Sequence, residues 1–211
     1  MKTLLLMRHA KSSWKDTELS DIDRPLSKRG KKDAPQMGAL LLEKELVPQI
    51  ILSSPAVRAR QTAELLAAAC EFTGDVQYLD SFYLAEPAAY VEGLVALPDD
   101  IELAMVIGHN PGLEGLLQMI SGRIESLPTS TIAYLSVPIS SWHELRSDTE
   151  GELLELLLPY EIEAEGKKAH EKEKEKEKER EREEEKEKEK EKERERQKEK
   201  EKEKKKGKGK K

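Results

Sequence analysis

The 211-residue sequence lacks the features that mark secreted, membrane-spanning and metal-binding proteins. It has one cysteine, Cys70, so no disulfide can form within the chain. No apolar run approaches the roughly 20 residues of a membrane span, and the apolar run near the N-terminus is too short for a secretory signal. There is no metal-ligand spacing and no glycine-rich nucleotide loop. We therefore expect a cytoplasmic, monomeric protein without a metal, a cofactor or a membrane span.

Charge divides the sequence into two parts. Residues 165–211 contain 23 basic and 18 acidic residues, which leaves 14 basic and 25 acidic residues in 1–164. This difference predicts a folded domain over 1–164 and a low-complexity Glu/Lys/Arg tail over 165–211, either disordered or a fluctuating helix. The net negative charge of the domain disfavours nucleic acid as its partner. Twelve of its 14 basic residues lie in the first 60 residues, where an anionic substrate would be drawn.

The order of apolar runs predicts an α/β fold. Short runs typical of buried strands cover 4–7, 50–52, 76–79 and 103–107. Helical patterns follow them over 27–46, 56–71, 87–97 and 111–120, and the first of these helices is expected to end at Pro48. Such alternation is typical of a parallel sheet with helices on both faces. Two later runs, 132–137 and 153–158, are not separated by a helix. The prediction is a three-layer α/β/α domain with a mostly parallel central sheet and an antiparallel edge hairpin.

Polar groups follow three of these strands, at the strand end or one turn later. They are Arg8 with His9, Ser54 with Arg58, and His109. The carboxyl ends of parallel strands lie at one edge of a sheet, so these side chains can converge. Two imidazoles and two guanidinium groups suit phosphoryl transfer, because a neutral imidazole can attack phosphorus while arginines bind its nonbridging oxygens. The helix after Asn110 would turn its free N–H groups and positive dipole end to the same place.

Each of these signals also has an ordinary explanation. An Arg–His pair is common on protein surfaces, Arg58 could be a solvated helix residue, and His109 could cap a helix. Their common position at the ends of consecutive elements of one predicted sheet favours a shared site.

Longer strings around these residues resemble the histidine phosphatase superfamily, which includes phosphoglycerate mutases and acid phosphatases. The strings are Leu-Met-Arg-His-Ala over 6–10, Arg-Pro-Leu-Ser with Arg-Gly over 24–30, Ser-Ser-Pro-Ala-Val-Arg-Ala-Arg-Gln-Thr-Ala over 53–63, and Val-Ile-Gly-His-Asn-Pro over 106–111. The resemblance spans nearly all of 1–160, and the SixA-type phosphohistidine phosphatases are the most similar branch. It implies a phosphoglycerate mutase-like fold in which His9 accepts the phosphoryl group, His109 is the second histidine, and Arg8 and Arg58 bind phosphate.

Other site residues are assigned with less sequence support. Asn110 is expected to bind phosphate, and Lys11, Ser12 and Glu86 are possible substrate-binding residues, although Lys11 and Ser12 could equally be solvated loop residues. A general acid would be Asp80 or Glu86, and both could be ordinary solvated carboxylates. Without an acid, the substrate should carry a leaving group that departs easily. A phosphoramidate fits that requirement better than a sugar phosphate.

Three functions follow from these residues. The leading hypothesis is hydrolysis of phosphohistidine on a phosphorylated protein, such as a phosphorelay histidine domain, through a phosphohistidine intermediate on His9. The alternative enzyme is a small-molecule phosphomonoesterase of the same superfamily. A noncatalytic binding module that acts through its charged tail is less favoured, because all four residues implied for phosphate transfer are present.

Overall fold

The computed structural model describes residues 1–159, so the tail predicted over 165–211 lies outside the described residues. Six strands form one sheet in the spatial order β3-β2-β4-β1-β5-β6. They are β1 Lys2–Arg8, β2 Ile50–Ser53, β3 Asp75–Tyr78, β4 Leu103–Gly108, β5 Ile132–Val137 and β6 Glu152–Leu157. Strands β1 to β4 run parallel, whereas β5 is antiparallel to both β1 and β6. The predicted mostly parallel sheet with an antiparallel edge is confirmed.

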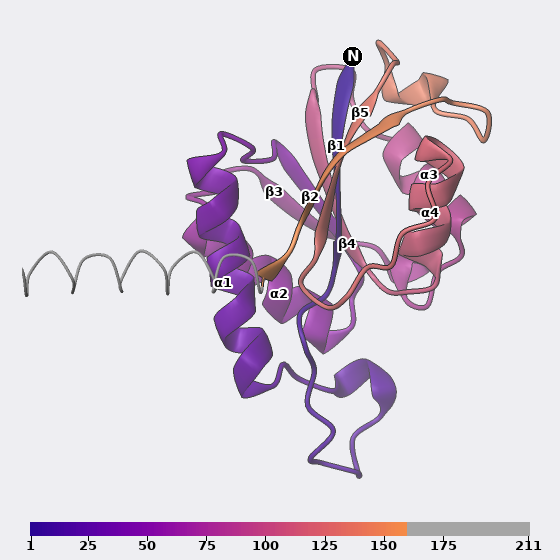
Figure 1. Cartoon of the computed structure of the whole chain (residues 1–211). Coiled ribbons are helices and arrows are strands. Elements are labelled where there is room, and N and C mark those ends of the chain that lie inside the picture. The colour runs from indigo at the N-terminus through magenta and orange to yellow at the C-terminus, as the bar shows by residue number, and fades with distance from the viewer. Residues whose placement is uncertain (160–211) are drawn as a thin grey trace, which may run out of the picture. The chain divides into compact units, whose positions relative to one another are not determined.

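Helices cover both faces of this sheet. The α-helices are α1 Lys28–Glu43, α2 Val57–Ala69, α3 Pro87–Val95 and α4 Gly112–Ser121, and the short 3-10 helices are η1 Asp21–Asp23, η2 Asp80–Phe82 and η3 Trp142–Glu144. Helices α1 and α2 lie together on one face, and α3 and α4 lie on the other (Figure 1). The three-layer α/β/α prediction is therefore confirmed. Within residues 1–159, no helix combines the length and the apolar character needed to cross a membrane.

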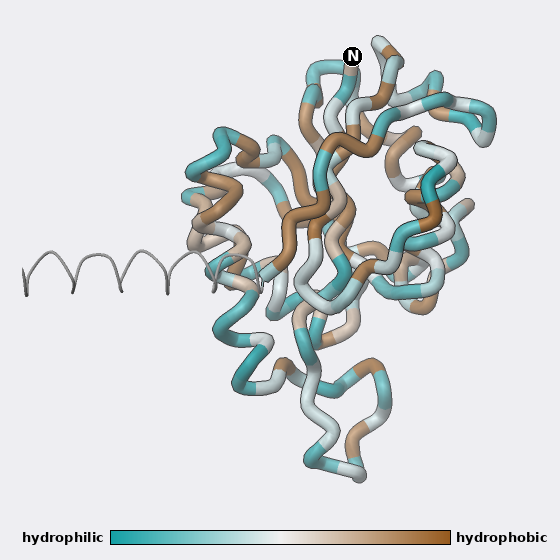
Figure 2. The backbone as a smooth tube through the Cα atoms, viewed as in Figure 1, coloured by the Kyte–Doolittle hydropathy of each residue, from teal (hydrophilic) through white to brown (hydrophobic). Residues whose placement is uncertain are grey.

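Alternate side chains of β1 enter two different hydrophobic cores, one on each face of the sheet. Leu4 and Leu6 belong to the core that includes α3 and α4, whereas Leu5 and Met7 pack with Met37 in the core under α1 and α2. Successive side chains of a strand point to opposite faces, and a strand covered on both faces has no polar side. Figure 2 shows the resulting concentration of apolar residues along the central strands. Strand β1 is thus fixed from both sides, which holds the residues at its end in place.

Helix α1 ends earlier than the sequence pattern predicts. Its last residue is Glu43, and the prediction that Pro48 ends it is wrong. Glu45 adopts a left-handed conformation with φ 57°, and the Leu46 N–H donates to the Leu41 carbonyl at 2.8 Å. A left-handed residue after the last turn stops a helix. The apolar pattern continues past this stop because Leu46 still packs against the core.

Candidate active site

The ends of two neighbouring parallel strands bring the predicted histidines together. Strands β1 and β4 pair in register with Arg8 opposite Gly108, so His9 and His109 follow adjacent strand ends. The His9 N–H donates to the Gly108 carbonyl at 3.1 Å and continues the pairing past the strand. The two ring centroids lie 4.9 Å apart. Both residues are buried, with His9 8% and His109 3% exposed.

Helix α2 contributes the guanidinium group that joins these rings. It follows β2, which is the other neighbour of β4 in the sheet. Arg58 lies in its first turn and is 2% exposed. The Arg58 Nε lies 3.3 Å from His9 Nε2, and its Nη2 lies 3.4 Å from His109 Nδ1. One buried side chain therefore contacts both histidines, which are 49 and 51 positions away along the chain.

Hydrogen bonds assign the tautomer of each imidazole. His9 Nδ1 lies 2.8 Å from the Ala10 carbonyl, which can only accept, so Nδ1 carries the hydrogen and Nε2 keeps its lone pair. In His109, Nδ1 accepts from Arg58, so Nε2 carries the hydrogen and donates to Ser54 Oγ at 2.8 Å. Both unprotonated nitrogens therefore face the same guanidinium group. A lone pair held beside a cationic group suits attack on an anionic electrophile.

Burial keeps both imidazoles neutral at pH 7. It is the main reason that the pKa of His9 falls to about 3, and the charges of Arg58 and Arg8 act in the same direction. Burial likewise lowers the pKa of His109 to about 4, with Arg58 as the next contributor. An uncharged imidazole is the form that can attack phosphorus.

Arg8 and Asn110 differ in the donors that they leave available. Arg8 Nη1 donates to the Leu127 carbonyl at 3.0 Å, but its Nε is buried and has no hydrogen-bond partner among the described residues. A buried donor without a partner is costly in a folded protein, which makes this group a candidate for binding an anion. Asn110 Nδ2 already donates to Glu114 Oε1 at 2.6 Å and to the Leu127 carbonyl at 2.9 Å. These contacts use both hydrogens of the side-chain amide, so Asn110 has no free side-chain donor for the predicted binding of phosphate.

The remaining predicted residues lie at the edge of the site or outside it. Ser12 is 7% exposed, and its Oγ accepts from Arg24 Nη1 at 2.9 Å. Lys11 is exposed on the loop after β1, Asp80 is exposed at the start of η2, and Glu86 is exposed just before α3. In the described part of the chain, no hydrogen bond or ion pair joins Lys11, Asp80 or Glu86 to either site histidine.

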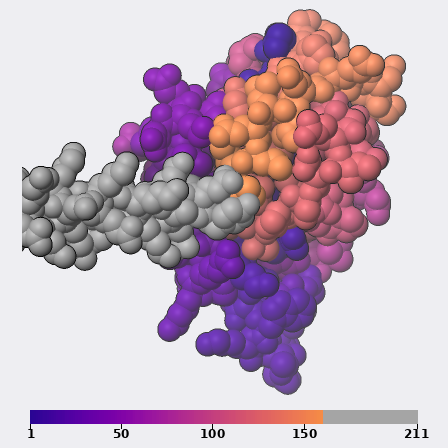
Figure 3. All heavy atoms as spheres, viewed as in Figure 1, coloured from indigo at the N-terminus to yellow at the C-terminus, as the bar shows by residue number. Residues whose placement is uncertain are grey.

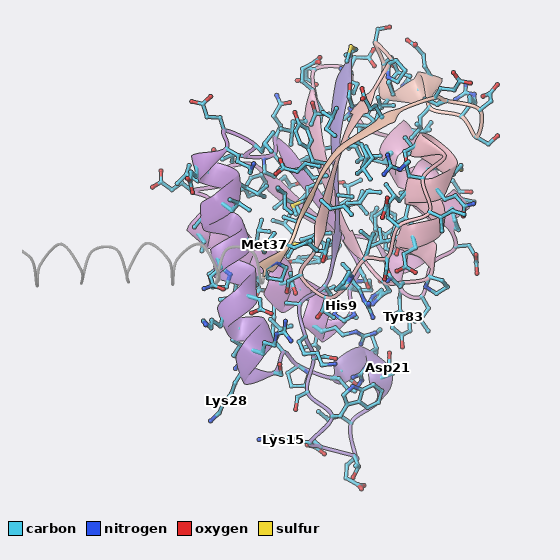
Figure 4. The ribbon with its side chains drawn as sticks, in the orientation of Figure 1. His9, Lys15, Asp21, Lys28, Met37 and Tyr83 are labelled. Atoms are coloured by element: carbon cyan, nitrogen blue, oxygen red, sulfur yellow. The ribbon has the colours of Figure 1, made fainter. Side chains whose placement is uncertain are left out.

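The structure adds a carboxylate that sequence reasoning missed. Asp21 Oδ2 accepts from Arg58 Nη2 at 2.9 Å and from the Tyr83 hydroxyl at 3.0 Å. Its Oδ1 accepts from Arg24 Nη2 at 2.6 Å and from Arg24 Nε at 3.0 Å. Figure 4 shows His9, Asp21 and Tyr83 at the same end of the sheet. Asp21 is one of several acidic residues in a polar loop, so nothing in the sequence distinguishes it from its neighbours.

The fold and the cluster of His9, His109 and Arg58 suit an enzyme that handles phosphoryl groups. Residues 4–82 match the histidine phosphatase superfamily (branch 1). An uncharacterised chloroplastic protein of Arabidopsis thaliana is 36% identical over 152 residues, which are 68% of this chain and 70% of that protein. The chain belongs to the histidine phosphatase superfamily.

Within this superfamily, the chain is similar to two solved structures of SixA-like proteins. A proposed phosphohistidine phosphatase SixA from Agrobacterium tumefaciens has a TM-score of 0.65 and 28% identity, over 75% of this chain and 98% of that one. A proposed phosphohistidine phosphatase SixA from Nakamurella multipartitia has a TM-score of 0.66 and 25% identity, over 75% of this chain and 96% of that one. The predicted phosphoglycerate mutase-like fold and the resemblance to SixA-type proteins are both confirmed.

Proposed function

We propose that the protein hydrolyses phosphohistidine on a protein substrate through a phosphoryl group carried by His9. The observation that carries this proposal is the orientation of His9. Its Nδ1 is held by the Ala10 carbonyl at 2.8 Å, so the lone pair of Nε2 faces the Arg58 Nε at 3.3 Å. A neutral nucleophile next to a buried cation is arranged for attack on a bound phosphoryl group. Similarity to proteins described as SixA phosphohistidine phosphatases supports this choice of substrate.

The reaction has two half-reactions. In the first, the His9 Nε2 lone pair forms a bond to phosphorus while the P–N bond of the substrate breaks and its electron pair returns to the leaving imidazole. In the second, water attacks the phosphoryl group on His9, the new P–N bond breaks, and its electron pair returns to Nε2. The proton lost by the water passes to phosphate or solvent. Arg8 and Arg58 bind the nonbridging oxygens in both steps, and the phosphoryl group replaces the contacts of Arg58 with the two histidines.

His109 supports the phosphoryl group through its Nδ1 atom. Its Nε2–H is committed to Ser54, so the nitrogen that can face the anion is Nδ1, which accepts from Arg58 until the anion binds. Burial and nearby cations lower the pKa of His109 to about 4 before an anion binds. A phosphoryl dianion raises the pKa of an adjacent imidazole. His109 then takes up a proton at Nδ1 and donates it in a hydrogen bond to a phosphoryl oxygen.

The carboxyl groups around the site favour a phosphoramidate over an ester. An alkoxide leaving group needs a proton donor, whereas an imidazole protonated on its second nitrogen departs as a neutral molecule. Asp80 and Glu86 are exposed and make no contact with the histidines among the described residues. Asp21 does lie at the site, but its pKa is lowered to about 2 and it is ionised at pH 7.

The proposal is tested by comparing phosphate release from a phosphohistidine-bearing phosphorelay domain and from a panel of sugar and nucleotide monophosphates. We expect the phosphohistidine protein to be preferred, and His9→Ala to lose on the order of a thousandfold or more of the activity. His143→Ala is a matched control because His143 is exposed and outside the site. A clear preference for the esters would favour the phosphomonoesterase alternative.

The intermediate provides an independent measurement. Labelled substrate is mixed with the enzyme and quenched without acid, because a phosphoramidate bond does not survive acid, and the label is located by mass spectrometry. We expect it on the peptide that contains His9. Label on a serine, a threonine or another histidine would contradict the proposed mechanism.

A further inference from the structure

Asp21 contacts the same guanidinium group that the phosphoryl group must use. Its carboxylate binds Arg58 Nη2 at 2.9 Å, and its backbone carbonyl accepts from Arg58 Nη1. The Arg58 Nε points inward to His9 Nε2. Arg58 therefore connects the nucleophile on its inner side with a carboxylate on its outer side. A phosphoryl group bound to Arg58 must lie next to the negative charge of Asp21.

This carboxylate is held firmly at its position. Arg24 donates to it through both Nε and Nη2, and Arg24 is itself 7% exposed. The Arg24 guanidinium also stacks on the ring of Trp14 at 3.5 Å and donates to Ser12 Oγ. Arg24 holds Oδ1 of the carboxylate while Arg58 and Tyr83 hold Oδ2, so both oxygens have fixed partners. Asp21 is therefore a built part of the site, although its side chain is partly exposed.

The charge of Asp21 is maintained at neutral pH. Partial burial would raise its pKa, but the hydrogen bonds from Arg24 and Tyr83 and the charge of Arg58 outweigh burial and lower the pKa to about 2. Asp21 therefore cannot donate a proton to a leaving group at pH 7. It can only interact with the leaving group as an anion.

Asp21 lies on the side of the site from which a leaving group would depart. Its side chain is 43% exposed, whereas that of Arg58 is 3% exposed. Tyr83, which donates to Asp21, packs edge-on against His109 with ring centroids 5.9 Å apart. In phosphoryl transfer the nucleophile and the leaving group lie roughly in line on opposite sides of phosphorus. With His9 on the buried side, the leaving group is on the more exposed side, where Asp21 lies (Figure 4). Residues from the N-terminal part of the chain form the surface at this end of the molecule (Figure 3).

From this arrangement we infer that Asp21 selects phosphoramidates whose leaving group is a protonated, cationic nitrogen base. The inference rests on the proposed function and assigns its substrate preference to one residue. A carboxylate beside an imidazole favours the protonated ring. The proton sits on the ring nitrogen that is not bonded to phosphorus. When the P–N bond breaks, its electron pair returns to the other nitrogen and the imidazole leaves uncharged.

The same carboxylate disfavours phosphate esters. Cleavage of a P–O bond leaves the electron pair on an oxygen anion, which would develop beside the ionised Asp21. Like charges a few ångströms apart repel, and the repulsion is strongest where water is partly excluded. Asp21 therefore has opposite effects on the two substrate classes, which a purely structural residue would not have.

Asp21→Asn tests the inference because it removes the charge and retains the shape. The substrates are phosphoimidazole and p-nitrophenyl phosphate. Both leaving groups depart without an acid, but only imidazole carries a positive charge before it leaves. We expect kcat/KM for phosphoimidazole to fall about tenfold and kcat/KM for p-nitrophenyl phosphate to rise, so that their ratio changes more than tenfold. Asp21→Glu keeps the charge and should keep the preference for phosphoimidazole.

Asp23→Asn is the matched control. Asp23 lies in the same 3-10 helix and is exposed, and its carboxylate accepts from Ser20 Oγ in place of Arg58. The ratio of the two kcat/KM values should stay at its wild-type value in this variant. The Asp23→Asn variant removes one negative charge from η1 without changing the contact between Asp21 and Arg58.

The outcomes separate this inference from the proposed function. A fall for both substrates in Asp21→Asn would mean that Asp21 only positions Arg58, and a rise for both would mean that it only competes with phosphate. Either result overturns the inference, as does an unchanged ratio. If the wild-type protein hydrolyses p-nitrophenyl phosphate but not phosphoimidazole, the proposed function itself fails.

Discussion

At the scale of single residues, the site is organised by one buried arginine that hydrogen-bonds to two buried, uncharged histidines. Arg58 Nε and Nη2 lie 3.3 Å and 3.4 Å from nitrogens of His9 and His109. The two rings can lie beside the positive charge of Arg58 because they are neutral, whereas protonated rings would repel the guanidinium group. The same property makes folding stability depend on pH.

We predict that the two histidines destabilise the fold in mild acid. Their pKa values of about 3 and 4 in the folded protein lie below the value of about 6.5 for an unperturbed histidine. The unfolded chain then binds more protons as the pH falls below about 6.5, so stability that is complete at neutral pH is lost toward pH 4. For His9 the loss between pH 7 and pH 5 is about 2 kcal/mol.

Urea unfolding of His9→Gln at both pH values measures this contribution. The variant should lose about 2 kcal/mol less than the wild-type protein over the same interval. His143→Gln changes an exposed histidine outside the site and controls for the substitution itself. Equal losses in His9→Gln and the wild type would show that His9 does not carry a lowered pKa.

At the scale of elements, close backbone contacts hold the loop after β1 against its neighbours. The Thr62 hydroxyl accepts from the Ala10 N–H at 3.0 Å and donates to the Arg58 carbonyl at 2.6 Å, which ties α2 to the residue after the nucleophile. The first turn of α1 packs directly on Lys11. A Cβ atom on Gly30 would lie 2.3 Å from the Lys11 carbonyl oxygen. Two helices therefore fix the backbone next to His9.

We predict that Gly30→Ala destabilises the protein although it is a substitution inside a helix. Alanine favours helix over glycine by about 1 kcal/mol, but the backbone of Lys11 has to move to admit the methyl group, and such overpacking costs about 1–3 kcal/mol. We therefore expect a lower unfolding midpoint and a reduced kcat/KM. Lys31→Ala, at an exposed position of the same helix, should change neither. A more stable Gly30→Ala protein would show that the backbone of Lys11 can move away from position 30 at little cost in free energy.

The elements were more predictable than their ends. Apolar runs that stop at polar residues locate β1 and β4 because the middle of each strand is buried on two faces and carries only apolar side chains. The end of α1 was missed because it depends on the left-handed conformation of Glu45, a residue without a preference for it. The spacing of apolar residues does not depend on the backbone conformation of a single residue, so it cannot predict this helix end.

At the scale of the whole molecule, the sheet topology determines which distant residues meet. Strands β2, β4 and β1 are adjacent, so the groups that follow them converge at one edge. The sequence order of apolar and polar residues was sufficient to predict the meeting of His9, Arg58 and His109. It was insufficient for Asp21 and Tyr83, because their contact depends on the path of an irregular loop and of η2 across the end of the sheet.

We predict that removal of residues 165–211 leaves the chemistry unchanged. Every side chain of the described site belongs to residues 8–109. Truncated and full-length proteins should therefore hydrolyse a small phosphoramidate with kcat/KM values within about twofold of each other. Arg58→Ala in the full-length chain shows that the assay detects damage to the site. A large loss on truncation would place part of the tail in catalysis.

The bond between His9 Nδ1 and the Ala10 carbonyl would also decide the chemical identity of the proposed intermediate. The ring nitrogen nearer to the main chain is occupied, which leaves only the distal nitrogen for phosphorylation. The enzyme would therefore form a single positional isomer of phosphohistidine, whichever isomer its substrate carries. A substrate phosphorylated on the proximal nitrogen would pass its phosphoryl group to the distal position, so the first half-reaction would convert one regioisomer into the other.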